Sequence, residues 1–321
     1  MTLKFDNAYI KDSYSFIGRN EYELNIKGNE MVNDYYMGKK SFELGEVEYQ
    51  KRSIKGLLNK NKLNKSNIDL LISGDLQNQL FASYFAGRSF KSPILGIYSA
   101  CSTFLEGLFI SSMLADKYKY KNLIVTTSAN NLASEKQFRF PIEYGAIRKV
   151  VNTFTVSAST STLVTSEKTH IKIESATVGK VVDIGYKDAN NMGACMAPGA
   201  ALTISEHLKD LKRKASYYDI ILTGDLGIYG SKILKEYLDK EYDINLENQI
   251  DAGEIIFNNK NQIAGGSGPV CLPLALFDKI LKNKKYKKIL LVGTGSLHSK
   301  LSTGLSLSIP SISHAISLEV E

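Results

Sequence analysis

Two apolar runs rich in β-branched residues recur along the chain and end in the same dipeptide. IDLLISGDL occupies residues 68–76, and YDIILTGDL occupies residues 218–226. A continuous apolar run of this length is typical of a strand buried on both faces of a parallel sheet. Each run closes on Gly-Asp, so Asp75 and Asp225 are predicted at the carboxyl ends of two matched strands.

A second pair of similar segments follows in the same order. YKYKNLIVTTS at 118–128 resembles KKYKKILLVGTG at 284–295. The first pair lies 150 positions apart, whereas Leu123 and Ile289 of the second pair lie 166 apart. The second half therefore carries an insertion between its matched strands, around Glu236 to Asn261. Two matched pairs in one order indicate an internal duplication.

Apolar residues at helical spacing separate the strands of each pair. Ser102–Tyr118 and Pro269–Leu281 predict helices buried on nearly all sides. Amphipathic segments predict helices that cover the sheet faces, at Glu46–Lys60, Ile204–Lys214 and Gly230–Lys240. The pattern predicts an α/β fold of βαβ units with mostly parallel sheets. We expect two halves, residues 1–167 and 168–321, that meet near 167–173.

Composition and charge narrow the class of partner. The 321 residues are 43% hydrophobic and 23% charged, which is ordinary globular composition. Forty Lys and Arg against 33 Asp and Glu leave a net charge of +7, which could suit nucleic acid, an anionic lipid surface or an acidic small ligand. The lysines gather at predicted helix ends and turns, as on a solvated face, so we expect no nucleic-acid partner.

Cysteine usage and hydropathy indicate an intracellular protein. Three cysteines without paired spacing, Cys101, Cys195 and Cys271, support neither a disulfide framework nor a zinc site. The opening residues contain no apolar segment of a signal peptide. The longest apolar stretch, Ser92–Ala115, is interrupted by polar residues and does not predict a membrane span.

Cys101 is predicted at a sharp turn. Residues 93–100 predict a strand, and the first buried helix follows directly after Cys101. Free N–H groups and the positive end of the helix dipole can stabilise a thiolate or bind an anion there. Ser102 and Thr103 are available as capping residues. The alternative is that Cys101 is only a small apolar side chain in a crowded turn.

The partners that a nucleophilic cysteine needs are scarce. Of four histidines, His207 is predicted on a surface helix and His170 at a charged strand start, which leaves His298 and His314 as candidates for a site. The offset of 166 between the two halves aligns Ser267, in the turn AGGSG, with Cys101. This turn, with Gly266, lets backbone N–H groups approach an oxyanion or carboxylate closely.

Six stretches in this order resemble the stage V sporulation protein AD family, a thiolase-like family of spore-forming bacteria. They run from about residue 65 to the C-terminal region: IDLLISGDLQNQ (68–79), SACSTFLEGL (99–108), EKQFRFPIEYG (135–145), the segment 173–201 that contains ATVGKVVDIGYKDANNMGACMAPGAA, YDIILTGDLG (218–227) and AGGSG (264–268). The long fourth stretch is the most specific. The first 65 residues match poorly.

The resemblance implies a fold, a ligand and partners. It implies a thiolase-like five-layer αβαβα fold, a homodimer packed through central strands, and binding of dipicolinic acid or its calcium chelate by machinery that loads the forespore. Integral membrane channel proteins are the implied partners, which would place the chain at the periphery of the spore inner membrane. Asp75 and Cys101 map to the family's ligand pocket, and Asn130 replaces a histidine that family members often carry.

A planar dianion requires donors and cations, and the sequence offers several. We expect the N–H groups at Cys101, Ser102 and Thr103, the turn of Gly266 and Ser267, and the Arg139 guanidinium to supply them. Asp75 could hold an accompanying Ca²⁺, and no other metal site or cofactor is predicted. Turn capping is the alternative for Asp75 and Asp225, and an interface salt bridge is the alternative for Arg139.

Three functions stay open at this point. Condensing enzymes of the superfamily use a His, or a His and an Asn, on the second-half turns, and these turns here contain neither. A non-catalytic dipicolinate-binding protein is therefore the first hypothesis. An acyl-CoA condensing or acyl-transfer enzyme that uses Cys101 is the alternative, and a scaffold without a ligand is the third.

Overall fold

The computed structural model describes residues 1–19, 24–138, 154–257 and 264–321. The strands are β1 (Thr2–Lys4), β2 (Tyr9–Arg19), β3 (Glu30–Met31), β4 (Leu70–Gly74), β5 (Ile94–Gly96), β6 (Leu123–Ala129), β7 (Ser157–Thr165), β8 (Ile171–Thr177), β9 (Ile220–Thr223), β10 (Gln249–Asp251), β11 (Lys288–Ser296) and β12 (Ser311–Val320). The α-helices are α1 (Phe42–Lys60), α2 (Phe81–Gly87), α3 (Thr103–Tyr118), α4 (Asn131–Phe138), α5 (Met192–Leu211), α6 (Gly227–Tyr242), α7 (Ala252–Phe257), α8 (Cys271–Ala275) and α9 (Lys300–Gly304).

The two halves of the sheet have the same order of strands, counted inward from each edge. In the described part of the chain it is β10-β9-β11-β12-β8-β2-β7-β6-β4-β5, with β1 paired to β8 and β3 to β2. The repeated strands form parallel neighbours in each half, β4 beside β6 and β9 beside β11. Antiparallel strands extend both groups, β7 and β2 in one half and β12 and β8 in the other.

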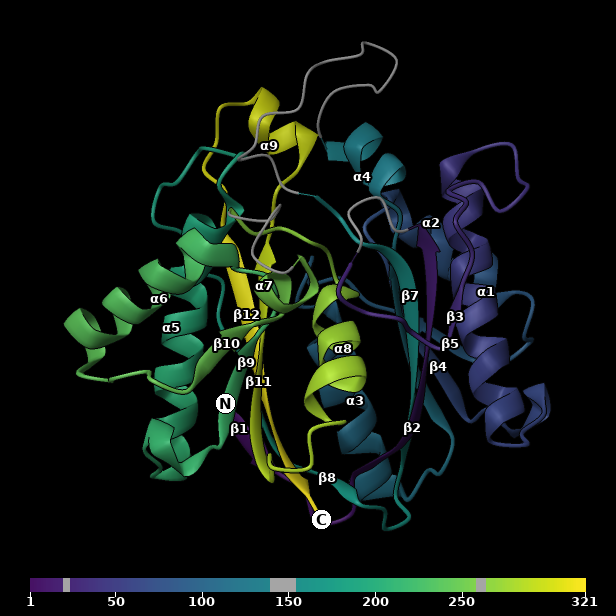
Figure 1. Cartoon of the computed structure of the whole chain (residues 1–321), viewed down its shortest axis with the longest axis horizontal. Helices are drawn as coiled ribbons and strands as arrows, with labels where there is room; N and C mark the ends of the chain where they lie inside the picture. Colours follow the sequence, from purple (N-terminus) through teal and green to yellow (C-terminus); the bar gives the residue numbers. More distant parts are fainter. Residues whose placement is uncertain (20–23, 139–153, 258–263) are drawn as a thin grey trace.

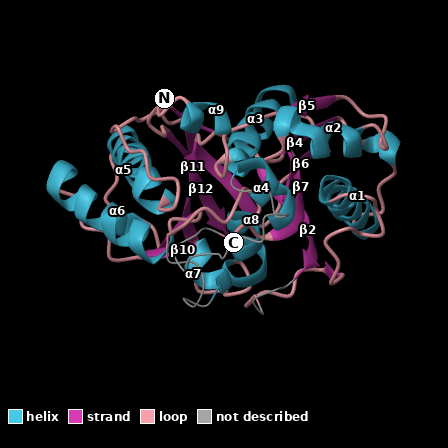
Figure 2. Cartoon of the chain, turned by 90° about the horizontal axis from the view of Figure 1, so that it is seen from above, coloured by secondary structure: helices cyan, strands magenta, loops and turns pink. Residues whose placement is uncertain are grey.

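The elements stack in five layers (Figure 1). Helices α1 and α2 cover one outer face, α5 and α6 cover the other, and α3 and α8 lie between the two groups of strands. Figure 2, seen from above, shows the same arrangement. The central layer is apolar because α3 and α8 are covered on both sides, and fully buried Phe104, Leu105 and Leu272 belong to the same core. The predicted α/β fold of two duplicated halves is confirmed.

Two predictions about helix α5 were wrong: its first residue and the exposure of His207. Helix α5 begins at Met192 and not at Ile204, although Gly193, Pro198 and Gly199 are poor helix formers. Small residues are needed there because α5 crosses α6 closely: a Cβ on Gly193 would lie 2.1 Å from the Leu226 carbonyl oxygen. His207 is also not on a surface. It is fully buried, between the Thr177 and Tyr218 hydroxyls at 2.7 Å each.

At the N-terminal end, helix α1 is longer than the sequence predicts and strand β1 is an additional element. Helix α1 begins four residues before Glu46, where the Ser41 hydroxyl accepts a hydrogen bond from the Leu44 N–H and caps it. Strand β1, at the very start of the chain, pairs with β8 of the other half. The chain thus returns its first strand to the second group of strands, which ties the two groups together.

The close crossing of α5 and α6 can be tested with one methyl group. We expect Gly193→Ala to lower the free energy of unfolding by roughly 1–3 kcal/mol, because the added Cβ meets backbone atoms that cannot move aside. Gly304→Ala at the end of α9 is the matched control, since its Cβ meets nothing within 4 Å. Equal denaturant midpoints for the two variants would contradict this account of the crossing.

Candidate functional site

The turn before α3 holds Cys101 in a strained and tightly fastened backbone. Ala100 adopts a left-handed φ of 49°, which is unfavourable for a residue other than glycine. The Thr103 hydroxyl accepts a hydrogen bond from the Ser99 N–H at 3.0 Å and donates to the Ala100 carbonyl at 2.6 Å. Thr103 therefore fastens the turn, and Ser102 makes no side-chain cap, contrary to its predicted role.

Cys101 borders a small cavity between the two groups of strands. Its volume is about 40 Å³, and its walls are mainly apolar and aromatic: Leu76, Tyr98, Ala100, Cys101, Ser134, Phe138, Thr155, Met192, Gly266, Ser296 and His298. Such a space holds only a few water molecules. Lys and Arg are missing from the described part of its wall.

The Cys101 thiol faces the buried Asp225 carboxylate and hydrogen-bonds to it. Burial, reinforced by the negative charge of Asp225, holds the pKa of Cys101 well above its usual value. The thiol is therefore protonated at neutral pH and is a poor nucleophile. Burial also raises the pKa of Asp225 to about 6.

Asp225 accepts hydrogen bonds from N–H groups that we had expected to bind a ligand. The Gly266 N–H donates to its backbone carbonyl at 2.9 Å, and the Gly268 N–H donates to its carboxylate at 3.2 Å. The Thr294 hydroxyl donates to the same carboxylate at 2.7 Å. The turn from 264 to 268, whose glycines 265, 266 and 268 have positive φ, thus wraps around Asp225. The N–H groups of Gly266 and Gly268 are thus engaged by Asp225, and ligand binding at Gly266 and Ser267 stays a prediction.

The N–H groups at the start of α3 are also engaged within the chain. The Ser102 N–H donates to the Ser99 carbonyl at 2.9 Å, and the Thr103 N–H donates to the Ala100 carbonyl at 3.3 Å. Neither Ser102 nor Thr103 borders the cavity. Arg139, the predicted guanidinium, lies outside the described residues.

Asp75, the counterpart of Asp225, belongs to a buried polar cluster behind the cavity. Its carboxylate accepts hydrogen bonds from the Gln77 N–H and from the N–H and hydroxyl of Ser83. The neighbouring Glu46 carboxylate accepts from Gln77 Nε2 and the Ser128 hydroxyl, both at 2.7 Å. Burial and the nearby Asp75 raise the pKa of Glu46 to about 8. Asp75 fastens its own turn and does not border the cavity.

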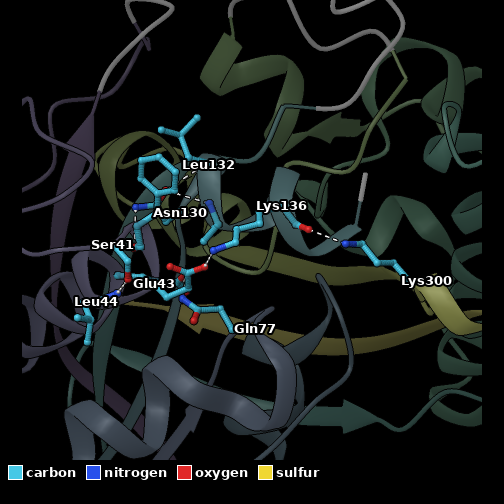
Figure 3. Close-up of polar contacts among 11 residues, drawn as sticks. Ser41, Glu43, Leu44, Gln77, Asn130, Leu132, Lys136 and Lys300 are labelled. Atoms are coloured by element: carbon cyan, nitrogen blue, oxygen red, sulfur yellow. Dashed lines mark hydrogen bonds and ion pairs between the residues drawn. The ribbon is translucent and has the colours of Figure 1, made fainter. Parts of the chain in front are cut away.

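Asn130 connects α4 to the segment that precedes α1. Its side-chain N–H groups donate to the Tyr35 and Phe42 carbonyls, at 3.0 and 3.2 Å, and its Oδ1 accepts from the Leu132 N–H at 3.0 Å (Figure 3). It is completely buried and does not border the cavity. Asn130 therefore positions α4, and its role in ligand binding stays a prediction.

Two aromatic residues of the cavity wall, Tyr98 and Phe138, were missed from the sequence, whereas His298 was among its candidates. Tyr98 precedes α3, Phe138 ends α4, and His298 follows β11, so they are far apart in the chain. His298 is the one histidine of the described chain that borders the cavity. His314 instead lies at 3.2 Å from the Ser99 hydroxyl, and burial lowers its pKa to about 4. Across the described residues, His, Cys, Asp and Glu form no group of three suited to a metal.

Comparisons with known proteins agree on the family and the fold. The sequence model for stage V sporulation protein AD matches residues 1–319. Stage V sporulation protein AD from Bacillus subtilis (strain 168) is 38% identical over 291 residues, which cover 89% of this chain and 86% of that protein.

Solved structures with the same fold are condensing enzymes in several cases. The 3-oxoacyl-[acyl-carrier-protein] synthase III from Aquifex aeolicus VF5 superposes with a TM-score of 0.61 at 13% identity, over 97% of this chain and 99% of that one. An OleA variant from Xanthomonas campestris superposes with a TM-score of 0.65 at 11% identity, over 99% and 98%. At this level of identity the likeness confirms the thiolase-like fold alone.

The protonated state of Glu46 predicts how stability depends on pH. A carboxyl whose pKa is raised in the folded state keeps its proton there while the unfolded chain releases it, so stability falls as pH rises from about 4.5 to about 8. We expect Glu46→Gln, which imitates the protonated acid, to flatten this decline in denaturant titrations between pH 5.5 and 8.5. Glu236→Gln on exposed α6 is the control. Parallel profiles for Glu46→Gln and wild type would refute a proton on Glu46.

The Asp225 charge predicts the reactivity of Cys101. Asp225→Asn removes the charge that disfavours the thiolate, so we expect alkylation of Cys101 by iodoacetamide at pH 8 to be several-fold faster than in wild type. Peptide mass spectrometry separates the three cysteines. Cys195 is the internal reference, because Asp225 raises the pKa of Cys271 as well. An unchanged or slower rate at Cys101 would show that Asp225 does not set its protonation.

Proposed function

The chain belongs to the stage V sporulation protein AD family, and from this membership and the cavity at Cys101 we propose that it binds dipicolinic acid as the calcium chelate without catalysing a reaction. Membership and fold carry the sporulation role. The ligand rests on one observation, the aromatic and apolar wall formed by Tyr98, Phe138 and His298 beside a protonated thiol.

The wall of the cavity fits a flat ring of low net charge. Aromatic side chains pack against a planar ring with favourable face or edge contacts. An ionised dicarboxylate in an apolar site without cations carries a large desolvation cost. A one-to-one complex of dipicolinate with Ca²⁺ has no net charge, so it suits this wall better than the free dianion does. Its calcium would retain the two carboxylates of the ligand itself.

The same geometry argues against condensation chemistry. A condensing enzyme needs a thiolate and donors for the oxyanion that develops on the thioester carbonyl. Here the thiol is paired with a carboxylate, and the N–H groups of Gly266 and Gly268 are engaged by Asp225. A negative charge in that place would destabilise an oxyanion.

Two further parts of the proposal concern assembly. We propose that the chain acts as a homodimer and attaches to integral membrane proteins of the spore that conduct the ligand. The helices of the described regions include none with the length and apolarity of a membrane span. Attachment through partner proteins at the spore inner membrane is consistent with that finding.

Calorimetry with dipicolinate, with excess Ca²⁺ or with a chelator of calcium, tests the ligand. We expect binding in the presence of Ca²⁺ and at least tenfold weaker binding without it. Tyr98→Leu should weaken binding about fivefold, because an aromatic contact contributes roughly 1 kcal/mol. Tyr84→Leu, on α2 outside the cavity wall, is the control. Absence of heat for the wild type under both conditions would refute the proposal.

A further inference from the structure

The cavity at Cys101 is closed to any ligand of the size of an aromatic acid. Pockets that hold small organic ligands measure roughly 300–1,000 Å³, whereas this cavity measures about 40 Å³. Phe138, at the end of α4, lies across from His298 with ring centroids 5.8 Å apart. Ser134, one turn earlier in α4, also borders the cavity. Helix α4 therefore forms one wall, and a ligand can enter only if a wall moves.

Apolar burial holds α4 only weakly. The buried residues of this eight-residue helix are Asn131, Ala133 and Ser134, all with small or polar side chains. A fully buried large apolar side chain contributes roughly 1.5–3 kcal/mol. None is present in α4, where the large apolar residue in contact with the core, Phe138, is only partly buried. Helices with so little apolar burial open at low cost relative to the core. Helix α3, by contrast, buries Phe104, Leu105 and Leu108 completely.

Polar contacts on the surface fasten α4 to three neighbouring elements. Lys136 pairs with Glu43 of α1 at 3.0 Å, and Gln137 donates to Asn78 at 2.6 Å. Lys300 of α9 donates to the Lys136 carbonyl at 2.7 Å (Figure 3). Exposed pairs of this kind contribute roughly 0–1 kcal/mol each. The buried contacts of Asn130 at the other end of α4 are harder to break, which makes that residue the natural pivot.

A polar groove lies on the outer side of α4. It has a volume of about 590 Å³ and is lined by Glu43, Gln77, Asn78, Gln79, Phe81, Ala133, Lys136, Gln137 and Lys300. A second hollow of about 250 Å³ lies between the groove and the cavity. It shares Asn78 and Gln137 with the groove, and Phe138 and His298 with the cavity. Moving α4 outward would join all three spaces.

We propose that α4 is a lid that pivots at Asn130 and opens the Cys101 cavity into this groove, where Lys136 and Lys300 first receive a carboxylate ligand. The class of ligand rests on the proposed function, but the lid does not. A carboxylate at Lys136 competes with Glu43 and so releases one of the contacts that keep the lid closed. The amide groups of Gln77, Asn78 and Gln79 supply further hydrogen bonds along the groove.

Alkylation of Cys101 reports the open lid without any need for the natural ligand. When opening is fast relative to reaction, the rate follows the population of the open form. We expect Glu43→Gln, which removes the ion pair between Glu43 and Lys136, to increase the rate with iodoacetamide about threefold or more. Glu236→Gln, which breaks the exposed pair of Glu236 and Lys240 on α6, is the matched control and should not change it.

A covalent lock gives the opposite result. In the double variant Glu43→Cys, Lys136→Cys, a short bismaleimide joins α1 to α4, and we expect alkylation of Cys101 to slow at least tenfold. The same variant capped at both positions with N-ethylmaleimide is the control for the substitutions. Unchanged rates after both release and locking would overturn the lid.

The charge of the reagent separates the access route from the lid. Iodoacetate and iodoacetamide are similar in size and differ in charge, so their rate ratio at Cys101 reports the electrostatics of access. We expect Lys300→Met to lower the iodoacetate to iodoacetamide ratio two- to fivefold at low salt, with the effect lost at high salt. Lys282→Met, outside the groove, is the control. A ratio that does not respond would overturn the route through the lysines.

These outcomes are independent of the calorimetric one. Alkylation rates that respond as expected in a chain that shows no heat with dipicolinate would retain the lid and reject the proposed ligand. Dipicolinate binding together with rates that do not respond would retain the ligand and reject the lid.

Discussion

The interaction on which the site depends is the satisfaction of one buried carboxylate, Asp225. Its oxygens collect donors from the β11 residue Thr294, from the glycine turn at 268, and from the Cys101 thiol before α3. A buried carboxylate without such partners would be very costly. The requirement draws the second-half turn and the first-half cysteine together, so Asp225 joins the two halves beside the cavity at Cys101. The donors used for this purpose cannot serve an oxyanion.

An aspartate follows the same strand in each of the duplicated halves, but the two aspartates have different hydrogen-bond partners. Asp75 closes on its own half: the Gln77 and Ser83 groups that it binds lie within eight residues of it. Asp225 reaches across to Cys101 of the other half. After β4 the chain runs through residues 75–80 to α2 and supplies the donors of Asp75. After β9 it enters α6 within three residues, and the N–H groups of Leu226 and Gly227 donate to Asp251 instead of Asp225. Identical Gly-Asp motifs therefore hold one turn in place and build one site.

The sequence predicted what depends on local pattern, and missed what depends on contacts between distant segments. The matched strands β4, β6, β9 and β11 were predictable because buried parallel strands have a continuous apolar signature. The N-terminal part of α5 was missed, because Gly193, Pro198 and Gly199 disfavour a helix. The reason for Gly193, its close approach to the start of α6, exists only in the folded chain. Cys101 was found from its turn. His298 was a candidate because two other histidines could be assigned elsewhere. Tyr98 and Phe138 become its neighbours only in the folded chain, and no spacing reveals them.

The net charge of +7 does not by itself indicate a ligand, whereas the positions of individual lysines in the structure do. Most charged contacts are exposed pairs, and such pairs add little to stability. Lys136 and Lys300 differ because they line a groove beside α4, a wall of the cavity that buries no large apolar side chain completely. An anion is best bound in the groove, where water still solvates its charge. The apolar cavity favours a neutral species. On the proposed function, the lysine groove and the uncharged cavity are thus two stages for one ligand, whose charge must be compensated by calcium before it passes α4.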